Sequence, residues 1–172
     1  MKSVYNFVVK PKGERYNNTK TLDGKELILN TEIFNHQYVN REAEVISTPI
    51  IGNTDIKPGD TVVVHHNVFR RWHNVKGVEK NSKAYFNEDT YFINQDQIFL
   101  YKRNDTWIAP KGYCFVIPLK ATDKFNTKSE KPLQGIVKYS DGTVEVGDLV
   151  GFKPSSEYEF IVDGERLFRV LI

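Results

Sequence analysis

Three histidines lie near one another in the sequence and are candidates for binding a metal ion. His65 and His66 are adjacent, and His73 follows them. Adjacent residues of a strand point to opposite faces, so His65 and His66 would not ligate one ion together. No carboxylate spacing completes a zinc-like ligand set around them. The sequence therefore predicts neither a metal site nor a cofactor.

The run Arg70-Arg71-Trp72-His73 combines cations with an aromatic ring, which is the chemistry of a platform for single-stranded nucleic acid. The 24 basic and 22 acidic residues of the chain, however, are scattered and leave a formal net charge of +2. Such a balance provides no global field for nucleic acid or for an anionic membrane. We therefore interpret the run as a solvated hairpin tip and expect no nucleic-acid partner.

The residue patterns of known catalytic motifs are missing from the sequence. It contains no glycine-rich phosphate cradle, no nucleophile elbow and no paired histidine and carboxylate motif. The single cysteine, Cys114, lies in an apolar run and is predicted to be a small core residue. One cysteine also excludes an internal disulfide, which fits a reducing cytoplasm. We expect that the protein is not an enzyme.

No segment of the sequence predicts export or a membrane span. The residues from Met1 to Asn6 contain no apolar signal core, and no stretch approaches the roughly 18 consecutive apolar residues of a membrane helix. We expect a cytoplasmic protein with no membrane partner, which acts in the host cytoplasm if the chain is viral.

Short runs of β-branched and aromatic residues recur between turn residues and predict β-strands. No window sustains helical spacing with an N-cap before it and glycine after it, which argues against an α/β nucleotide-binding fold. At 172 residues, the chain can form two compact β units or one elaborated barrel. We therefore predict an all-β protein. The runs are residues 7–9, 43–47, 61–69, 91–93, 98–101, 113–118, 135–139, 149–152, 160–162 and 167–172.

One short pattern occurs twice in the chain. Residues 56–63 include the pair Gly59-Asp60, and residues 144–151 include Gly147-Asp148 in the same position. A small apolar strand precedes each pair, and a hairpin-like segment follows it. The same elements in the same order indicate an internal duplication in which both Gly-Asp pairs are structural turns. The strands are residues 43–46 and 135–137, and the hairpin-like segments are residues 91–101 and 160–171.

A long polar segment, about residues 16–42, interrupts the first copy and contains Leu27-Ile28-Leu29. Loops longer than about 12 to 15 residues are uncommon in compact domains and are usually functional or disordered. Two interpretations stay open here. Either the three apolar residues contact a partner, or this stretch is a strand that faces the core.

Taken together, these motifs resemble the GroES family of co-chaperonins, the ring-shaped lids of chaperonin cages. The stretch Lys57-Pro58-Gly59-Asp60-Thr61-Val62-Val63 is similar to the family's Val-x-x-Gly-Asp-x-Val signature. The segment with Thr19-Lys20, Gly24 and Leu27-Ile28-Leu29 resembles the family's mobile loop, whose apolar tripeptide grips the chaperonin. Further likenesses are residues 7–11, 44–46 and 98–109 in the first copy and residues 135–137, 146–150 and 162–168 in the second.

The resemblance implies a GroES-like β-barrel repeated in tandem, in residues 1–109 and, in shortened form, in residues 110–172. It also implies that Leu27, Ile28 and Leu29 bind a group I chaperonin. The protein would then assist folding as a co-chaperonin and form a homo-oligomeric ring. The alternative is a structural or assembly protein, such as a virion component, that reuses the fold for symmetric packing.

The chain departs from the family pattern in several places. Only residues 49–56 are available for the family's roof hairpin, and residues 70–89 form an insertion without a family counterpart. In the second copy, residues 120–132 contain no apolar tripeptide, and the sequence stops at Ile172, where the family has a further strand. Because that strand helps to join neighbours in the family, its absence leaves the ring geometry open.

Overall fold

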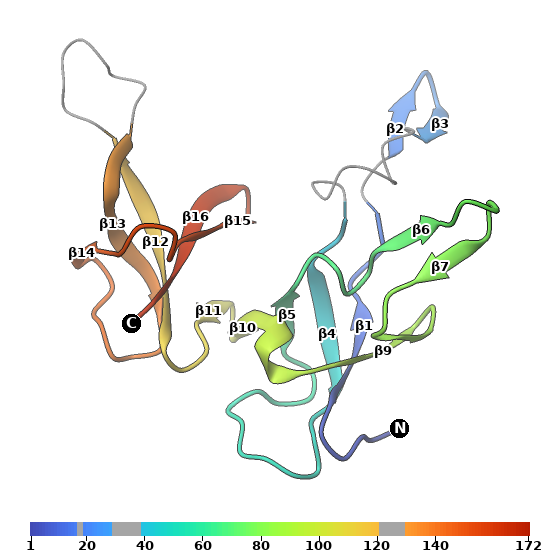
Figure 1. Ribbon diagram of the computed structural model, residues 1–172, viewed down its shortest axis with the longest axis horizontal. Helices are drawn as coiled ribbons and strands as arrows, with labels where there is room; N and C mark the ends of the chain where they lie inside the picture. Colours follow the sequence, from blue (N-terminus) through green and yellow to red (C-terminus); the bar gives the residue numbers. More distant parts are fainter. Residues whose placement is uncertain (17–18, 29–38, 121–129) are drawn as a thin grey trace. The chain divides into compact units, whose positions relative to one another are not determined.

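The computed structural model of the chain divides into two compact units, Met1–Asn104 and Asp105–Ile172 (Figure 1). The structure describes residues 1–16, 19–28, 39–120 and 130–172. Their regular structure is β-strand apart from the 3-10 helix η2 (Gln95–Gln97), which confirms the predicted all-β class. Within these residues, no helix has the length and apolar character to cross a membrane.

The first unit consists of one antiparallel sheet and two separate hairpins. Its strands are β1 (Phe7–Pro11), β2 (Thr19–Leu22), β3 (Lys25–Ile28), β4 (Glu42–Ser47), β5 (Thr61–Val64), β6 (Arg71–His73), β7 (Glu79–Asn81), β8 (Tyr85–Asn87), β9 (Thr90–Ile93) and β10 (Ile98–Arg103). Within the first unit, the strands of the main sheet have the hydrogen-bonded order β10-β5-β4-β1-β9-β8. β2 pairs with β3, and β6 pairs with β7, in two-stranded sheets of their own.

Apolar residues of the central strands form the core of the first unit. β5 lies between β4 and β10, and its Val62, Val63 and Val64 are buried. Phe69 and Tyr91 are fully buried and meet edge to face, with 4.8 Å between their ring centroids. Such a pair adds a preferred geometry to the burial of a large aromatic surface. The chain that leaves β5 is therefore held against the sheet.

The second unit contains one five-stranded antiparallel sheet. The strands of this sheet are β12 (Tyr113–Lys120), β13 (Glu130–Ser140), β14 (Leu149–Gly151), β15 (Tyr158–Val162) and β16 (Glu165–Leu171). β11 (Thr106–Ile108) also belongs to the second unit but lies outside this sheet. The sheet has the order β14-β13-β12-β16-β15. Phe115, Phe160 and Leu167 are fully buried, and Cys114 is a buried free thiol, which confirms its prediction as a core residue. Burial raises the pKa of the Cys114 thiol.

The two sheets share one strand order. The series β5-β4-β1-β9-β8 of the first unit corresponds to the series β14-β13-β12-β16-β15 of the second. The correspondence holds along the chain as well, because each series is numbered in the same relative order. The hairpin of β8 and β9 therefore corresponds to the hairpin of β15 and β16. It begins at Tyr85, within residues 70–89, whereas the sequence pattern placed the hairpin-like segment of the first copy at residues 91–101. Matching the two copies by sequence did not reveal this correspondence, because a sequence alone does not show which strands are hydrogen-bonded to each other.

The strand registers of the two sheets also agree. β1 has a register shift between Val8 and Val9, and β12 has one between Phe115 and Val116. A slip of one residue would turn every side chain of a strand to the other face, so a buried sheet specifies its register strongly. The corresponding pairs are Val9↔Val45 with Val116↔Val137, Pro11↔Ala43 with Pro118↔Gly135, and Ala43↔Val62 with Gly135↔Val150.

The units differ at the outer edges of β5 and β14. In the first unit, β10 pairs with β5. In the second unit, no strand in the described part of the chain pairs with the corresponding edge of β14. Leu149 of β14 is 64% exposed, whereas Thr61, its counterpart in β5, is half-buried. The second sheet therefore has an open edge at the position that β10 covers in the first.

Candidate functional site

The apolar residues predicted to contact a partner lie in or next to the hairpin of β2 and β3. Leu27 and Ile28 belong to β3, and Leu29 lies outside the described residues. β3 pairs with β2 and, within the ranges that the structure describes, with no strand of the main sheet. Leu27 and Ile28 thus belong to a strand, and the partner of this strand is β2 and not a strand of the main sheet.

A tight turn explains why this hairpin forms. Asp23 and Gly24 connect β2 to β3 and both have positive φ, at 50° and 75°. A two-residue hairpin turn with positive φ at both positions is of type I′, which Asp-Gly favours. Asp23-Gly24 is therefore a local signal for the hairpin, which the sequence analysis missed because it assigned these residues to a long loop.

The two ends of segment 16–42 are closed into a neck by main-chain and amide hydrogen bonds. Tyr16 and Val39 form an isolated antiparallel bridge. Next to it, the Asn40 main-chain N–H donates to the Arg15 carbonyl at 2.9 Å. The Asn40 side-chain Nδ2 donates to the carbonyls of Lys12 and Glu14, at 3.0 and 2.9 Å. The segment that carries Leu27 and Ile28 is therefore joined to the sheet through a defined base.

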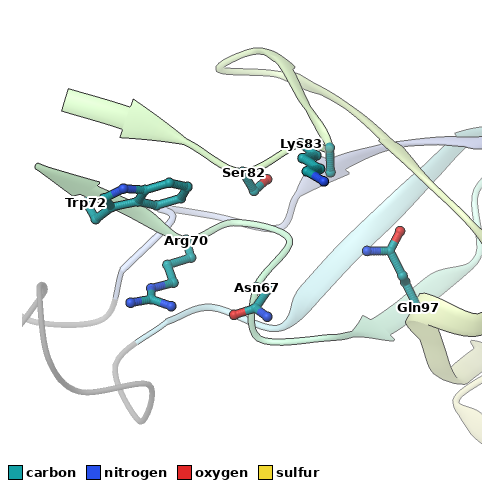
Figure 2. A pocket seen from close by; sticks show the side chains of 7 residues that line it. Asn67, Arg70, Trp72, Ser82, Lys83 and Gln97 are labelled. Atoms are coloured by element: carbon teal, nitrogen blue, oxygen red, sulfur yellow. The ribbon is translucent and has the colours of Figure 1, made fainter. Parts of the chain in front are cut away.

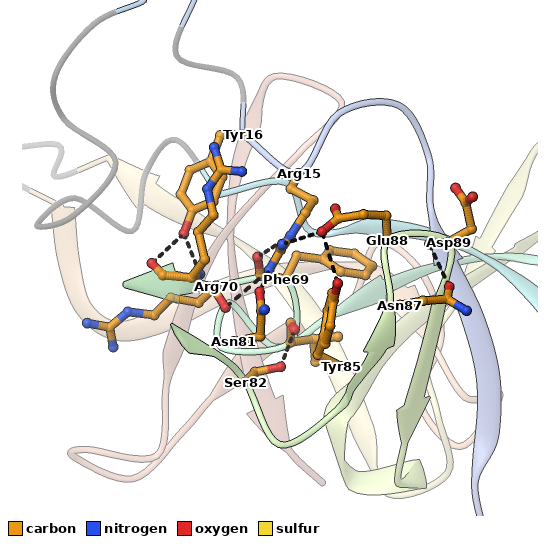
Figure 3. Close-up of polar contacts among 12 residues, drawn as sticks. Arg15, Tyr16, Phe69, Arg70, Asn81, Ser82, Tyr85, Asn87, Glu88 and Asp89 are labelled. Carbon is orange, nitrogen blue, oxygen red and sulfur yellow. Dashed lines mark hydrogen bonds and ion pairs between the residues drawn. The ribbon is translucent and has the colours of Figure 1, made fainter. Parts of the chain in front are cut away.

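Arg15 anchors this neck to the chain that follows β5, as Figure 3 shows. Its side chain is 6% exposed. The guanidinium donates from Nε to the Phe69 carbonyl at 3.1 Å and from Nη2 to Asn81 Oδ1 at 2.8 Å, with a longer contact of 3.5 Å to the Arg70 carbonyl. Its Nη1 atom lies 3.4 Å from Oε1 of Glu88. A buried cation is stable only when its donors are paired in this way.

Aromatic rings complete the surroundings of the Arg15 guanidinium. Its central carbon lies 5.4 Å from the ring centroid of Tyr85 and 5.7 Å from that of Tyr91. Both distances fall within the range of cation–π attraction. The guanidinium therefore has hydrogen-bond acceptors and two aromatic rings around it.

Tyr16 makes a second connection between the neck and β6. Its hydroxyl accepts from the Arg71 main-chain N–H at 2.8 Å and donates to the Arg71 carbonyl at 3.2 Å (Figure 3). The Arg71 guanidinium lies 5.1 Å from the Tyr16 ring centroid. The sequence analysis did not single out Arg15 or Tyr16, because their partners lie 54 to 73 residues away and no local pattern marks them.

The Tyr91 ring lies next to the Arg15 guanidinium, and the Tyr91 hydroxyl is buried without a hydrogen-bond partner among the described residues. Burial raises the pKa of Tyr91 to about 12. Because a tyrosine in the unfolded chain titrates near pH 10, the unfolded chain loses its proton first. The contribution of Tyr91 to stability is therefore complete below about pH 10 and is lost as the pH rises toward 12.

Replacing Tyr91 with phenylalanine is expected to leave stability at pH 8 unchanged or to raise it by up to about 1 kcal/mol, because the variant has no unpaired buried hydroxyl. Above pH 10 the variant should also lose less stability than the wild type. Urea unfolding at pH 8 and pH 11 measures both effects. A clear loss of stability at pH 8 would show that the hydroxyl has a partner in solution.

The first Gly-Asp pair forms a tight turn against β4. Gly59 has φ of 91°, a conformation that glycine adopts without strain. Its N–H donates to the Val45 carbonyl at 2.8 Å, and the Val45 N–H donates to the Asp60 carbonyl at 3.0 Å. The Asp60 N–H donates to the Lys57 carbonyl at 3.1 Å.

The second Gly-Asp pair makes the same three hydrogen bonds. Gly147 has φ of 98°, and its N–H donates to the Val137 carbonyl at 2.8 Å. The Val137 N–H donates to the Asp148 carbonyl at 2.9 Å, and the Asp148 N–H donates to the Glu145 carbonyl at 3.2 Å. The two turns therefore agree atom by atom in their main-chain bonding.

The aspartate side chains of the two turns differ. Asp60 is buried and accepts from the Lys57 N–H at 2.8 Å and from Arg103 at 2.6 Å. A second contact joins Arg103 Nε to Asp60 Oδ1 at 3.3 Å. The hydrogen bond with Asp60 raises the pKa of Arg103. Asp148 is exposed, and none of the ion pairs described by the structure includes it.

The histidines do not follow the geometry expected from the sequence. β5 ends at Val64, so His65 and His66 lie beyond the strand, and their rings stack with 4.2 Å between centroids. The expectation that they point to opposite faces was wrong, because it assumed that the strand continues. In the described part of the chain, no three His, Cys, Asp or Glu side chains are grouped closely enough to hold a metal ion.

The run Arg70–His73 is not the tip of a hairpin. Arg71, Trp72 and His73 form β6, and the turn lies further along, where the Gly77 N–H donates to the Asn74 carbonyl at 2.9 Å. The run is therefore one arm of a hairpin whose base is held by Arg15 and Tyr16.

Comparisons of the chain with protein-family models, with curated proteins and with solved structures found no match. The fold and the site by themselves define an all-β protein with two units of matching strand order. In its first unit, a hairpin-bearing segment leaves the main sheet through an anchored neck.

Proposed function

We propose that the chain is a co-chaperonin that binds a group I chaperonin through Leu27, Ile28 and Leu29 and assists protein folding. The observation that carries the proposal is the placement of Leu27 and Ile28. They lie in a hairpin that pairs with no described strand of the main sheet and that is joined to it by a bonded neck. This arrangement places the strand that carries Leu27 and Ile28 beyond an anchored base, as binding to a partner would require.

In this proposal, the two units are tandem copies of one GroES-like barrel, and the second copy is shorter. The common strand order, the equivalent register shifts and the identical main-chain bonds of the two Gly-Asp turns support a duplication. The long segment follows β1 in the first copy, and the corresponding connection after β12 is the shorter one. Chaperonin binding is therefore assigned to the first copy alone.

The energetics of such a contact require repetition. Burying Leu27, Ile28 and Leu29 would contribute roughly 1.5 to 3 kcal/mol each. Ordering the backbone costs about 1 to 2 kcal/mol per residue, so one segment binds weakly. Several segments on one ring would engage the chaperonin together and raise the effective concentration of each further contact. The proposal therefore includes a homo-oligomeric ring, active in the cytoplasm, whose contacts are individually releasable.

The proposal is tested by co-sedimentation of the full chain with its cognate group I chaperonin in the presence and absence of ATP. Wild-type protein is expected to bind in a nucleotide-dependent manner, and the triple variant Leu27→Ser, Ile28→Ser, Leu29→Ser is expected to lose binding. The double variant Val75→Ser, Val78→Ser is the matched control, since both valines are exposed on the other hairpin.

The possible outcomes separate the two classes of function. Binding that the triple variant loses and the control retains would support a co-chaperonin that uses this segment. A folded wild-type protein that does not bind its cognate chaperonin would instead point to the structural or assembly protein.

A further inference from the structure

The first unit has an open pocket of about 310 Å³ on the side of the β6 and β7 hairpin, which no part of the proposed function uses. Figure 2 shows Trp72 and Arg70 toward one end of this pocket and Gln97 at the other, with Ser82 and Lys83 between them. The volume lies at the lower end of the range for small-molecule sites. The pocket therefore has room for one small ligand.

One wall of the pocket is aromatic and cationic. Trp72 is 37% exposed, so part of its ring is open to a ligand. The Arg70 guanidinium lies 5.8 Å from the Trp72 ring centroid, and Lys83 also lines the pocket. Neither Arg70 nor Lys83 forms an ion pair with any residue that the structure describes. Two cations that have no acidic partner among the described residues thus accompany an accessible indole.

The chain around the pocket is held in place by buried hydrogen bonds. Ser82 Oγ donates to the Val68 carbonyl at 2.6 Å, which ties the two sides of the pocket together. Arg15 donates hydrogen bonds to the carbonyls of Phe69 and Arg70. Gln97 is fixed because its Oε1 atom accepts from the Asn94 main-chain N–H at 2.9 Å. A site whose walls are fixed in advance loses less entropy when a ligand binds.

We propose that this pocket binds a nucleoside phosphate, either free or as one nucleotide of a single strand. The Trp72 ring would stack on the base, since stacking on an aromatic side chain tolerates any base. Arg70 and Lys83 would bind the phosphate, and the amides of Asn67 and Gln97 supply donors for polar groups of the ligand. The inference is independent of chaperonin binding, because no pocket residue belongs to segment 16–42.

The near-neutral charge of the whole chain does not contradict this site. A net charge of +2 predicts weak attraction at long range, and it led to the expectation of no nucleic-acid partner. A pocket that holds one phosphate requires only local cations. Arg70 and Lys83 both line the pocket although they are not neighbours in the sequence, so no local motif predicts the site.

Tryptophan emission provides a direct test with the full chain. The two tryptophans differ in exposure, because Trp72 is accessible and Trp107 is 5% exposed. Uridine and adenosine monophosphates, and a single-stranded pentanucleotide, are expected to quench the Trp72 emission. Trp72→Phe should abolish the quenching but keep binding by calorimetry, and Trp72→Ala should weaken binding at least about fivefold.

The charged residues are tested in the same assay. Arg70→Gln and Lys83→Gln are each expected to weaken binding about tenfold. Lys76→Gln is the matched control, because Lys76 is an exposed lysine of the same hairpin that does not line the pocket, and it should bind like the wild type.

The ligand series separates the possible sources of the nucleotide. Equal affinity for a mononucleotide and the pentanucleotide would indicate a free nucleotide. At least tenfold tighter binding of the pentanucleotide, without competition by a duplex, would indicate a single strand. No quenching by either ligand, inorganic phosphate binding as tightly as the mononucleotides, or unchanged affinity in both charge variants would overturn the proposal.

Discussion

Replacing Arg15 with alanine is expected to lower the free energy of unfolding of the first unit by about 3 to 5 kcal/mol. The Arg15 side chain is almost fully buried and donates to the Phe69 and Arg70 carbonyls and to Asn81 Oδ1. Its removal would leave these acceptors without their donor inside the protein. Unpaired buried acceptors cost about 1 to 3 kcal/mol each, which makes this the most sensitive position of the neck.

Two further variants separate the role of the charge from that of the guanidinium geometry. Arg15→Lys keeps the charge but lacks the planar fork of donors, so we expect it to recover only part of the loss. Glu88→Gln should cost less than about 1 kcal/mol, because the Glu88 side chain is 63% exposed and the ion pair is screened.

Urea unfolding followed by tryptophan emission measures these changes, since Trp72 lies in the first unit and Trp107 in the second. Hydrogen exchange gives a local measurement, because the Asn40 N–H bonds to Arg15 and the Arg71 N–H bonds to Tyr16. Both amides should lose protection in Arg15→Ala. An Arg15→Ala protein within about 1 kcal/mol of the wild type would show that the network does not stabilise the neck.

The two Gly-Asp turns are expected to respond unequally to the same substitution. Asp60→Ala should lower the free energy of unfolding by about 2 to 4 kcal/mol, because it removes an acceptor for the Lys57 N–H and leaves Arg103 without its carboxylate. Asp148→Ala should have almost no effect on stability. Asp148 is exposed, and the main-chain bonds of its turn do not need a side chain.

A double-mutant cycle with Arg103→Ala isolates the ion pair from the turn. A coupling of about 1 kcal/mol or more between Asp60 and Arg103 is expected, since the two residues are in direct contact. Equal losses in the free energy of unfolding for Asp60→Ala and Asp148→Ala would contradict this explanation. In that case the shared backbone of the turn, and not the ion pair of the first copy, would explain the effect.

Features that depend on local pattern were predictable from the sequence. The β-branched runs predicted an all-β protein because alternation and turn residues act within a few positions. Cys114 was assigned to the core because its neighbours in the strand are apolar. Asp23-Gly24 also carried a local signal, and a stricter use of turn chemistry would have predicted the hairpin of β2 and β3.

Features that depend on where a strand ends were not predictable in the same way. The expectation for His65 and His66 failed because β5 stops one residue before them. The run from Arg70 to His73 was assigned to a hairpin tip, although its last three residues form β6. In both cases the sequence pointed to the correct residues, but the position where the strand ends or begins decided how those residues are arranged.

The sequence by itself determined the all-β class, the repeated Gly-Asp pattern and the presence of an apolar tripeptide in a polar segment. The tertiary structure alone decided that Arg15 and Tyr16 anchor that segment, that Arg70 and Lys83 share a pocket with Trp72, and that the two sheets agree in register. The physical reason is distance along the chain. Strand propensity and turn conformation act between neighbours, whereas hydrogen bonds, pockets and registers join residues that only the folded sheet brings together.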